Sequence, residues 1–164
     1  MRAFDPLGAL EVLSAHEIDF VLIGGLAARL HGSPTVTDDL DICHSAERDN
    51  LERLAEALRQ MEAKLRVAPA DVPFPLDART LAAGANFTFS TNYGPLDCMA
   101  LPAGVNGYDE LSRTADRMRF DDLEVLVASI DDLILMKRAA GRPQDLKELE
   151  ILGALKEELE RGNG

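Results

Sequence analysis

The sequence predicts one α/β (or α+β) domain in which strands and helices interleave around a mixed β-sheet and helices gather at the C-terminus. Short apolar runs of strand length alternate with amphipathic segments along the whole chain. No linker or internal repeat divides it, and 164 residues are enough for one hydrophobic core. Residues 1–164 are therefore expected to form a single domain.

Composition and charge restrict the class of protein. Hydrophobic residues make up 46% of the chain without a low-complexity tract, which is typical of a folded protein. No apolar run reaches membrane-spanning length, the N-terminus lacks a signal peptide's apolar core, and Cys43 and Cys98 have no metal-ligand spacing. A cytoplasmic protein with reduced thiols and no membrane association is expected. The net charge of -12 disfavours polyanions and favours a metal-bridged nucleotide or a small or cationic acceptor.

The N-terminal half is expected to contain three helices and two strands, followed by a loop. In chain order we expect a helix at 6–16 capped by Asp5, a strand at 18–25, a short helix at 26–32 ended by Gly32, a strand at 38–44, and a helix at 47–61 capped by Ser45. Prolines at 69, 73 and 75 interrupt any periodic pattern, so residues 64–84 are expected to form a long loop.

The C-terminal half begins with a predicted hairpin and ends in helices. The hairpin joins strands at 86–91 and 94–101 across Asn92–Gly94, and it precedes a short helix at 107–115 and two short strands within 117–129. A helix at 130–140 is expected to start from Ser129 and stop at Gly141, and Pro143 is expected to begin the last helix, to about Arg161.

Two consecutive glycines, Gly24 and Gly25, lie between the first expected strand and the short helix after it. Backbone N–H groups at such a turn can hold an anion, and glycine lets a phosphate approach closely. The spacing matches neither the dinucleotide fingerprint nor the P-loop. The alternative is a tight strand-to-helix turn with no ligand.

Three aspartates interrupt apolar strand patterns. Asp39 and Asp41 are two residues apart and are expected on one face of a strand, where their charges repel each other. Magnesium would compensate that charge, whereas a solvated edge strand would need no metal. Asp97 lies in a later strand, and if that strand neighbours the first, three carboxylates converge and can hold two metals. Otherwise Asp97 is merely a residue near a hairpin turn.

These motifs in this order resemble the nucleotidyltransferase superfamily, which has the polymerase-beta-like fold. The resembling features are the apolar strand ending in "GG", the short helix ending in "HG", the "TxDxD" strand from Thr37 to Asp41, and the later Asp97. The nearest resemblance is to small bacterial nucleotidyltransferases related to AbiEii-type toxins and to minimal nucleotidyltransferases, including the C-terminal run from Val125 to Leu152.

The resemblance implies roles for these residues. Gly24, Gly25 and Thr37 would lie on the nucleotide's side of the site, and Asp39, Asp41 and Asp97 would hold Mg²⁺ and take part in catalysis. Lys137 and Asp145 would also be catalytic, and Arg142 would contact a phosphate. The alternative for Lys137 and Asp145 is that they only complement the dipoles of two consecutive helices.

The function expected from this reading is magnesium-dependent transfer of a nucleoside monophosphate from a nucleoside triphosphate to an acceptor hydroxyl, with release of pyrophosphate. The acceptor could be tRNA, a protein or a cationic small molecule. Related sequences commonly carry arginine where this chain has Thr35. That departure favours the alternative of a catalytically degenerate binding module, such as a toxin–antitoxin partner, whereas the intact aspartates oppose it.

Overall fold

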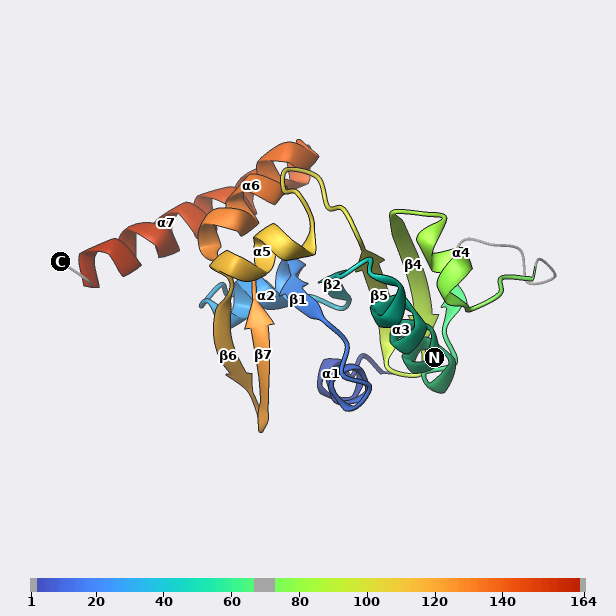
Figure 1. Ribbon diagram of the computed structural model, residues 1–164. Helices are drawn as coiled ribbons and strands as arrows, with labels where there is room; N and C mark the ends of the chain where they lie inside the picture. The colour runs from blue at the N-terminus through green and yellow to red at the C-terminus, as the bar shows by residue number, and fades with distance from the viewer. Residues whose placement is uncertain (1–2, 67–72, 163–164) are drawn as a thin grey trace.

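The computed structural model describes residues 3–66 and 73–162, which fold around a single mixed β-sheet (Figure 1). The helices are α1 (Pro6–Ala15), α2 (Gly24–Leu30), α3 (Arg48–Gln60), α4 (Ala78–Ala82), α5 (Tyr108–Thr114), α6 (Ile130–Ala140), the 3-10 turn η1 (Pro143–Asp145) and α7 (Leu146–Gly162). The strands are β1 (Phe20–Ile23), β2 (Leu40–His44), β3 (Lys64–Leu65), β4 (Asn86–Thr91), β5 (Gly94–Met99), β6 (Asp116–Phe120) and β7 (Leu123–Val127).

Strand order brings distant parts of the chain together at the centre of the sheet. The seven strands run β3-β4-β5-β2-β1-β7-β6, and β2 is antiparallel to β1 but parallel to β5. In that parallel pair Asp41 lies opposite Asp97. The sequence prediction of a mixed sheet flanked by helices, with a helical C-terminus, is confirmed.

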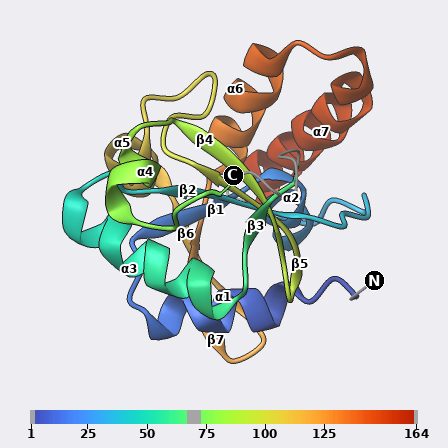
Figure 2. The same ribbon diagram turned by 90° about the vertical axis from the view of Figure 1, so that its right-hand side faces the viewer.

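Helices lie on both faces of the sheet, and those of one face gather over one half of it. Figure 2 shows α3, α4 and α5 on one side, and α2, α6 and α7 on the other. Helix α2 packs on β1 and β2, and α6 and α7 lie toward that half of the sheet, away from β3 and β4 (Figure 1). The core between the layers includes Leu22, Ile42 and Phe89, which are all fully buried.

Several predicted boundaries need correction. Residues 64–84 are not one loop, because β3 pairs with β4 and Asp77 caps α4 by accepting a hydrogen bond from the Thr80 N–H (2.8 Å). Pro69 lies outside the described residues. The first helical residue of α3 follows Glu47 rather than Ser45, although the Ser45 hydroxyl accepts from the Glu47 N–H (3.2 Å).

Three further boundaries differ. Gly24 and Gly25 begin α2 rather than ending β1, and β2 begins at Leu40, so Asp39 precedes the strand. Pro143 opens the 3-10 turn η1 before α7 starts at Leu146. A proline ring fixes φ at a helical value but donates no hydrogen bond, so it suits either kind of helical start.

Helix α6 has the predicted caps at both ends. The Ser129 hydroxyl accepts a hydrogen bond from the Asp132 N–H (3.1 Å), and Gly141 ends the helix in the left-handed conformation with φ of 63°. This termination places Lys137 in the last turn, where the chain reverses into η1. Of the helices in residues 3–66 and 73–162, none has the length and apolar character needed to cross a bilayer.

Candidate active site

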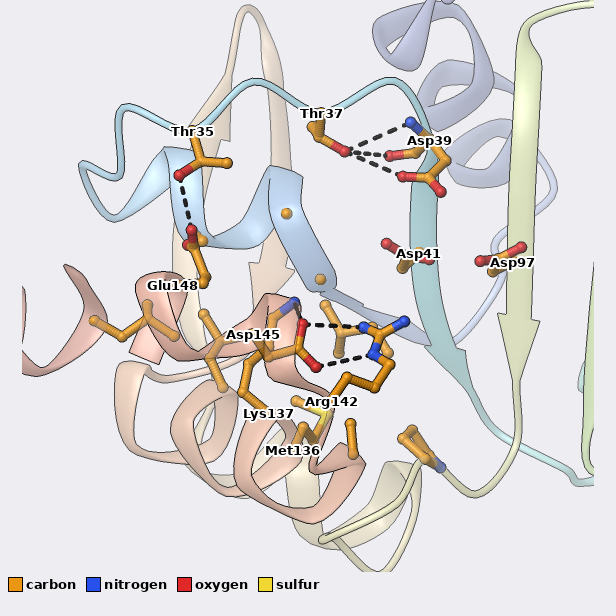
Figure 3. Close-up of a pocket in the computed structure, with 18 of the residues that line it drawn as sticks. Thr35, Thr37, Asp39, Asp41, Asp97, Met136, Lys137, Arg142, Asp145 and Glu148 are labelled. Carbon is orange, nitrogen blue, oxygen red and sulfur yellow. Dashed lines mark hydrogen bonds and ion pairs between the residues drawn. The ribbon is translucent and has the colours of Figure 1, made fainter. Parts of the chain in front are cut away.

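Three carboxylates converge at the centre of the sheet (Figure 3). Asp41 in β2 and Asp97 in β5 face each other across the parallel pair, and Asp39 joins them from the residues just before β2. One carboxylate oxygen from each lies within 4.8 Å of the others. The Thr37 hydroxyl donates to the Asp39 carboxylate (3.1 Å) and so orients it. The predicted convergence of the three aspartates is therefore present.

The three carboxylates of this acidic triad (Asp39, Asp41 and Asp97) repel one another, and the triad itself contains no cation. Burial, a hydrogen-bonding contact with Asp97 and the negative charges of Asp39 and Asp97 raise the pKa of Asp41 to about 8. The Asp97 Oδ1 atom is buried and has no hydrogen-bond partner among the described residues. Hard oxygen ligands, excess negative charge and a buried carboxylate oxygen without a hydrogen bond together fit a divalent cation such as magnesium.

The glycine pair is required by the way that α2 packs against the triad. Gly24 has a φ of +74°, and a Cβ atom there would lie 2.2 Å from the Asp41 Oδ2 atom. A Cβ atom on Gly25 would lie 2.9 Å from the Thr37 Cβ atom. Both side chains would therefore clash with the site. Packing alone therefore explains glycine at both positions, whether or not a phosphate also lies against them.

A cluster of two cations and one buried carboxylate lies beside the triad. Asp145 is only 4% exposed, and its carboxylate accepts from Arg142 through Nε (2.8 Å) and Nη2 (3.2 Å). Lys137 Nζ donates to the same carboxylate (3.2 Å). These bonds, that of Arg142 above all, lower the pKa of Asp145. Lys137 and Asp145 thus contact each other directly, which dipole complementation does not require.

All nine site residues expected from the sequence lie along one pocket of about 690 Å³. The triad forms one wall, and the cations of α6 and of the residue before η1 form another (Figure 3). The Lys137 charge is close enough to oppose, in part, the rise in the pKa of Asp41. The nine are Gly24, Gly25, Thr37, Asp39, Asp41, Asp97, Lys137, Arg142 and Asp145.

Residues 8–159 match the family described as "Nucleotidyltransferase of unknown function (DUF6036)". The chain belongs to this nucleotidyltransferase family. The match spans nearly the whole chain and so includes both the triad and the cation cluster. The resemblance expected from the sequence is confirmed at the level of the superfamily. No curated protein matches the chain.

Solved structures share the fold of this nucleotidyltransferase at low identity. The lincosamide antibiotic adenylyltransferase LnuA, bound to lincomycin, is 16% identical with a TM-score of 0.62, covering 91% of this chain and 94% of its own. The antibiotic-resistance factor ANT(2'')-Ia is 16% identical with a TM-score of 0.58, covering 92% and 80%. A nucleotidyltransferase from Thermotoga maritima is 12% identical with a TM-score of 0.50, covering 97% of both chains.

Glu148 of α7 is a site residue that sequence reasoning missed. Its carboxylate accepts from the hydroxyl groups of Thr35 (2.7 Å) and Ser33 (3.2 Å). These bonds attach the segment 33–37, which leads into the triad, to the C-terminal helix of the nucleotidyltransferase. An acidic residue in the first turn of a helix is ordinarily explained by the helix dipole, so the sequence alone gave no reason to select it.

Arg66 is the second residue that was missed. It follows β3, and its Nη2 atom lies 3.8 Å from the Asp97 Oδ1 atom. Arg66 falls in the proline-interrupted region that the sequence predicted to be a loop, where no strand register could be assigned. The strand pairing that brings it beside the triad is visible only in the folded sheet.

Proposed function

We propose that this nucleotidyltransferase moves a nucleoside monophosphate from a nucleoside triphosphate to an acceptor hydroxyl. The observation that carries the proposal is the acidic triad, in which the buried Asp97 Oδ1 atom has no hydrogen bond among the described residues, facing two cationic side chains across one pocket. Carboxylates on one side suit magnesium, and cations on the other suit phosphate oxygens. A nucleotide triphosphate bridged to the protein by metal combines both requirements.

In this proposal Asp39, Asp41 and Asp97 hold magnesium. Bound there, the metal would neutralise charge on the triphosphate and on the attacking oxygen. Thr37 fixes the Asp39 carboxylate through its 3.1 Å hydrogen bond. The turn at Gly24 and Gly25 lines the same pocket without side chains, which leaves room for the phosphates.

The cation cluster would hold the leaving pyrophosphate. Lys137 and Arg142 supply positive charge, and Asp145 fixes both cations in position through its three hydrogen bonds. The acceptor oxygen forms a bond to the α-phosphorus, the bond from that phosphorus to the bridging oxygen breaks, and pyrophosphate leaves. The acceptor's proton passes to the Asp97 carboxylate. Catalysis then consists mainly of positioning and charge neutralisation.

A small molecule is the acceptor class that the protein's charge favours over tRNA. The net charge of -12 repels a polyanion. Two structures with the same fold are described as a lincosamide antibiotic adenylyltransferase bound to lincomycin and as ANT(2'')-Ia in complex with adenylyl-2''-tobramycin. Both acceptors are small molecules. The free, buried thiols of Cys43 and Cys98 are consistent with a reducing cytoplasm.

Labelling tests the proposal. Each α-labelled triphosphate is incubated with the protein, magnesium and a cell extract, and transferred label is measured beside released pyrophosphate. Asp41→Asn is compared with Asp38→Asn, which removes the same charge from an exposed neighbour. We expect transfer by the parent and by Asp38→Asn, and loss in Asp41→Asn. Equal transfer by both variants would exclude the triad as the reactive centre.

A second candidate function is nucleotide binding without turnover, as in a toxin–antitoxin partner. It is favoured by position 35, where the Thr35 hydroxyl is bonded to Glu148 and the loop supplies no cation to the pocket. Magnesium-dependent triphosphate binding without pyrophosphate release in any extract would favour this function. Turnover with any acceptor would exclude it.

A further inference from the structure

At the level of the triad, a row of side chains runs from Arg66, just after β3, across β4 and β5 to β2. The Arg66 N–H donates to the Thr88 carbonyl (3.0 Å), Thr88 pairs with Asp97, and Asp97 pairs with Asp41. Residues directly opposite each other in a sheet point to the same face. Arg66, Thr88, Asp97 and Asp41 therefore share one face, and the 3.8 Å approach of Arg66 Nη2 to Asp97 Oδ1 agrees with this.

Asp41 has cations in one direction and a second carboxylate in another. Lys137 of α6 and Arg142, which precedes η1, line the pocket and lie below Asp41 in Figure 3. Asp97 in β5 lies beside Asp41, in the direction in which the sheet continues to β4 and β3 (Figure 3). In phosphoryl transfer the attacking and leaving oxygens are roughly in line on opposite sides of the phosphorus. With pyrophosphate at the cations, the acceptor approaches over β5 and β4.

This acceptor side is an open polar face. Asn86, Ser90 and Lys64 are exposed, whereas the other face of β4 carries Phe87 and Phe89, which pack with Phe74. Helices α2, α6 and α7 lie toward the opposite half of the sheet (Figure 1). Two cations, Lys64 and Arg66, lie on this face. Strands β3, β4 and β5 carry no other charged residue except Asp97 of the triad.

We infer that the acceptor is a small hydroxyl compound that carries an oxyanion, a phosphate or carboxylate, close to the reacting hydroxyl, and that Arg66 binds this oxyanion. The inference rests on the proposed function and specifies its acceptor. Arg66 lies beside the carboxylate that takes the acceptor's proton. Among the described residues its guanidinium has only that 3.8 Å contact, which is longer than a hydrogen bond. Its planar fork matches an oxyanion.

The same face argues against a cationic acceptor and against a nucleic acid. A cationic group placed near the reacting hydroxyl would meet Arg66 and be repelled. A nucleic acid would bring many phosphates to a protein of net charge -12, with Lys64 and Arg66 as the cations of this face. A single anionic group is what one guanidinium and one nearby ammonium can neutralise.

A binding experiment tests the Arg66 site without requiring turnover. Inorganic phosphate, then acetate, then spermidine is titrated into the ¹⁵N-labelled protein with magnesium present, and the Arg66 Nε–H resonance is followed by NMR. Its assignment comes from its loss in Arg66→Lys. This local reporter separates binding at Arg66 from phosphate binding at Arg142. We expect saturable shifts with both oxyanions and none with spermidine.

Two variants make the result specific. Arg66→Gln should weaken phosphate binding at the Thr88 amide about 10-fold or more, the scale of one charge-assisted contact. Lys64→Gln, on the same face two residue pairs further along β3 and β4, should weaken it less than about 3-fold. Absence of a saturable shift at Arg66, or unchanged binding in Arg66→Gln, would overturn the inference.

A labelling experiment tests the acceptor itself. The parent protein is incubated with labelled triphosphate and separate small-molecule, RNA and protein fractions of a cell extract, and the labelled product is cleaved with a phosphodiesterase. An acceptor that is small and anionic supports the inference, with a raised acceptor KM and an unchanged triphosphate KM in Arg66→Gln. A neutral or cationic acceptor, an RNA or a protein overturns it. No labelling at all contradicts the proposed function, and the phosphate titration still decides whether Arg66 binds an oxyanion.

Discussion

At the scale of single residues, ionisation of Asp41 lowers the stability of the fold but is required for the proposed metal binding. Its pKa is about 8 in the folded protein against 3.8 for an ordinary aspartate. Between these values the unfolded chain gives up a proton that the folded chain keeps, so the stability of the metal-free protein falls as pH rises from about 4 to 8. Asp41→Asn removes this effect because an amide does not ionise.

Asp41→Asn should therefore separate stability from activity. We expect its melting temperature without metal to exceed that of the parent at about pH 8, and its nucleotide transfer to fall at least ~100-fold. Thermal melts in chelator and initial rates in magnesium measure the two effects. A variant that is less stable than the parent under these conditions would show that the ionised carboxylate does not oppose folding.

Metal binding should depend on pH for the same reason. A divalent cation binds the ionised form of Asp41, so binding displaces the proton that the carboxyl group keeps below about pH 8. We expect the apparent affinity for Mn²⁺ to rise with pH from about 6 to 8, by at most ~10-fold per unit, and then to level off. Calorimetric titrations in buffers of different ionisation enthalpy would detect the released proton. An affinity that is constant over this range would contradict the raised pKa.

Lys137 and Arg138 form a natural matched pair at the end of α6. Both lie in the last turn, where a cation stabilises the helix by about 0.3–1 kcal/mol, but Lys137 also donates to the buried Asp145. Arg138→Ala should cost a little stability and leave activity intact. Lys137→Ala should lower kcat/KM for the triphosphate ~100-fold or more. Equal kinetics in the two variants would show that Lys137 only complements the helix dipole.

At the scale of elements, the start of α2 shows why the glycine pair cannot vary. Gly24→Ala would combine a positive φ with a Cβ atom 2.2 Å from the Asp41 carboxylate. Gly25→Ala would place its Cβ atom 2.9 Å from the Thr37 Cβ atom. Gly153 in α7 has nothing within 4 Å of its Cβ position and is the matched control.

We expect Gly24→Ala to destabilise the protein by about 1–3 kcal/mol and to abolish Mn²⁺ binding, because Asp41 must move. Gly153→Ala should stabilise it by about 0.4–1 kcal/mol. Urea unfolding and Mn²⁺ titration measure both effects. Intact metal binding in a folded Gly24→Ala protein would mean that the carboxylate does not need its present position.

The same scale shows which elements a sequence can predict. Helix α6 was predicted with both ends because Ser129 and Gly141 act locally, within a few residues of the backbone groups that they satisfy. Strand β3 was missed because its two residues have no periodicity of their own and are defined only by pairing with β4. Helix α4 was missed because it has five residues near several prolines.

At the scale of the whole molecule, the triad exists only in the assembled sheet. Asp41 and Asp97 come from strands that the α3–β4 region separates in sequence, and they meet through the parallel pairing of β2 with β5. Magnesium or Mn²⁺ should therefore bind the folded chain alone and raise its melting temperature with concentration. Asp97→Asn should largely remove that rise, which differential scanning calorimetry would measure. A metal-dependent rise that persists in Asp97→Asn would indicate another cation site.

The same dependence on assembly explains how much of the site was predictable. The aspartates stood out because charge within an apolar strand pattern is unusual, and the sequence placed all three. Arg66 and Glu148 gave no such signal, because a charged residue in a loop or at a helix start is ordinary. Their contacts with Asp97 and Thr35 depend on tertiary packing, which no local pattern encodes.

Because Asp41 pairs with Asp97 across two parallel strands, the proposed metal binding also depends on the register between β2 and β5. A slip of one residue between β2 and β5 would turn Asp97 to the opposite face and bring Leu96 or Cys98 into its place. The slip would also turn Leu96 and Cys98, which are buried in the observed register, out of the core. The helices need not change, so far-UV circular dichroism would report this loss of apolar burial poorly. The misfolded chain would also lack one of the three carboxylates proposed to hold the metal. Retention on a column of immobilised divalent metal, eluted with free metal, would thus sort refolded protein by strand register.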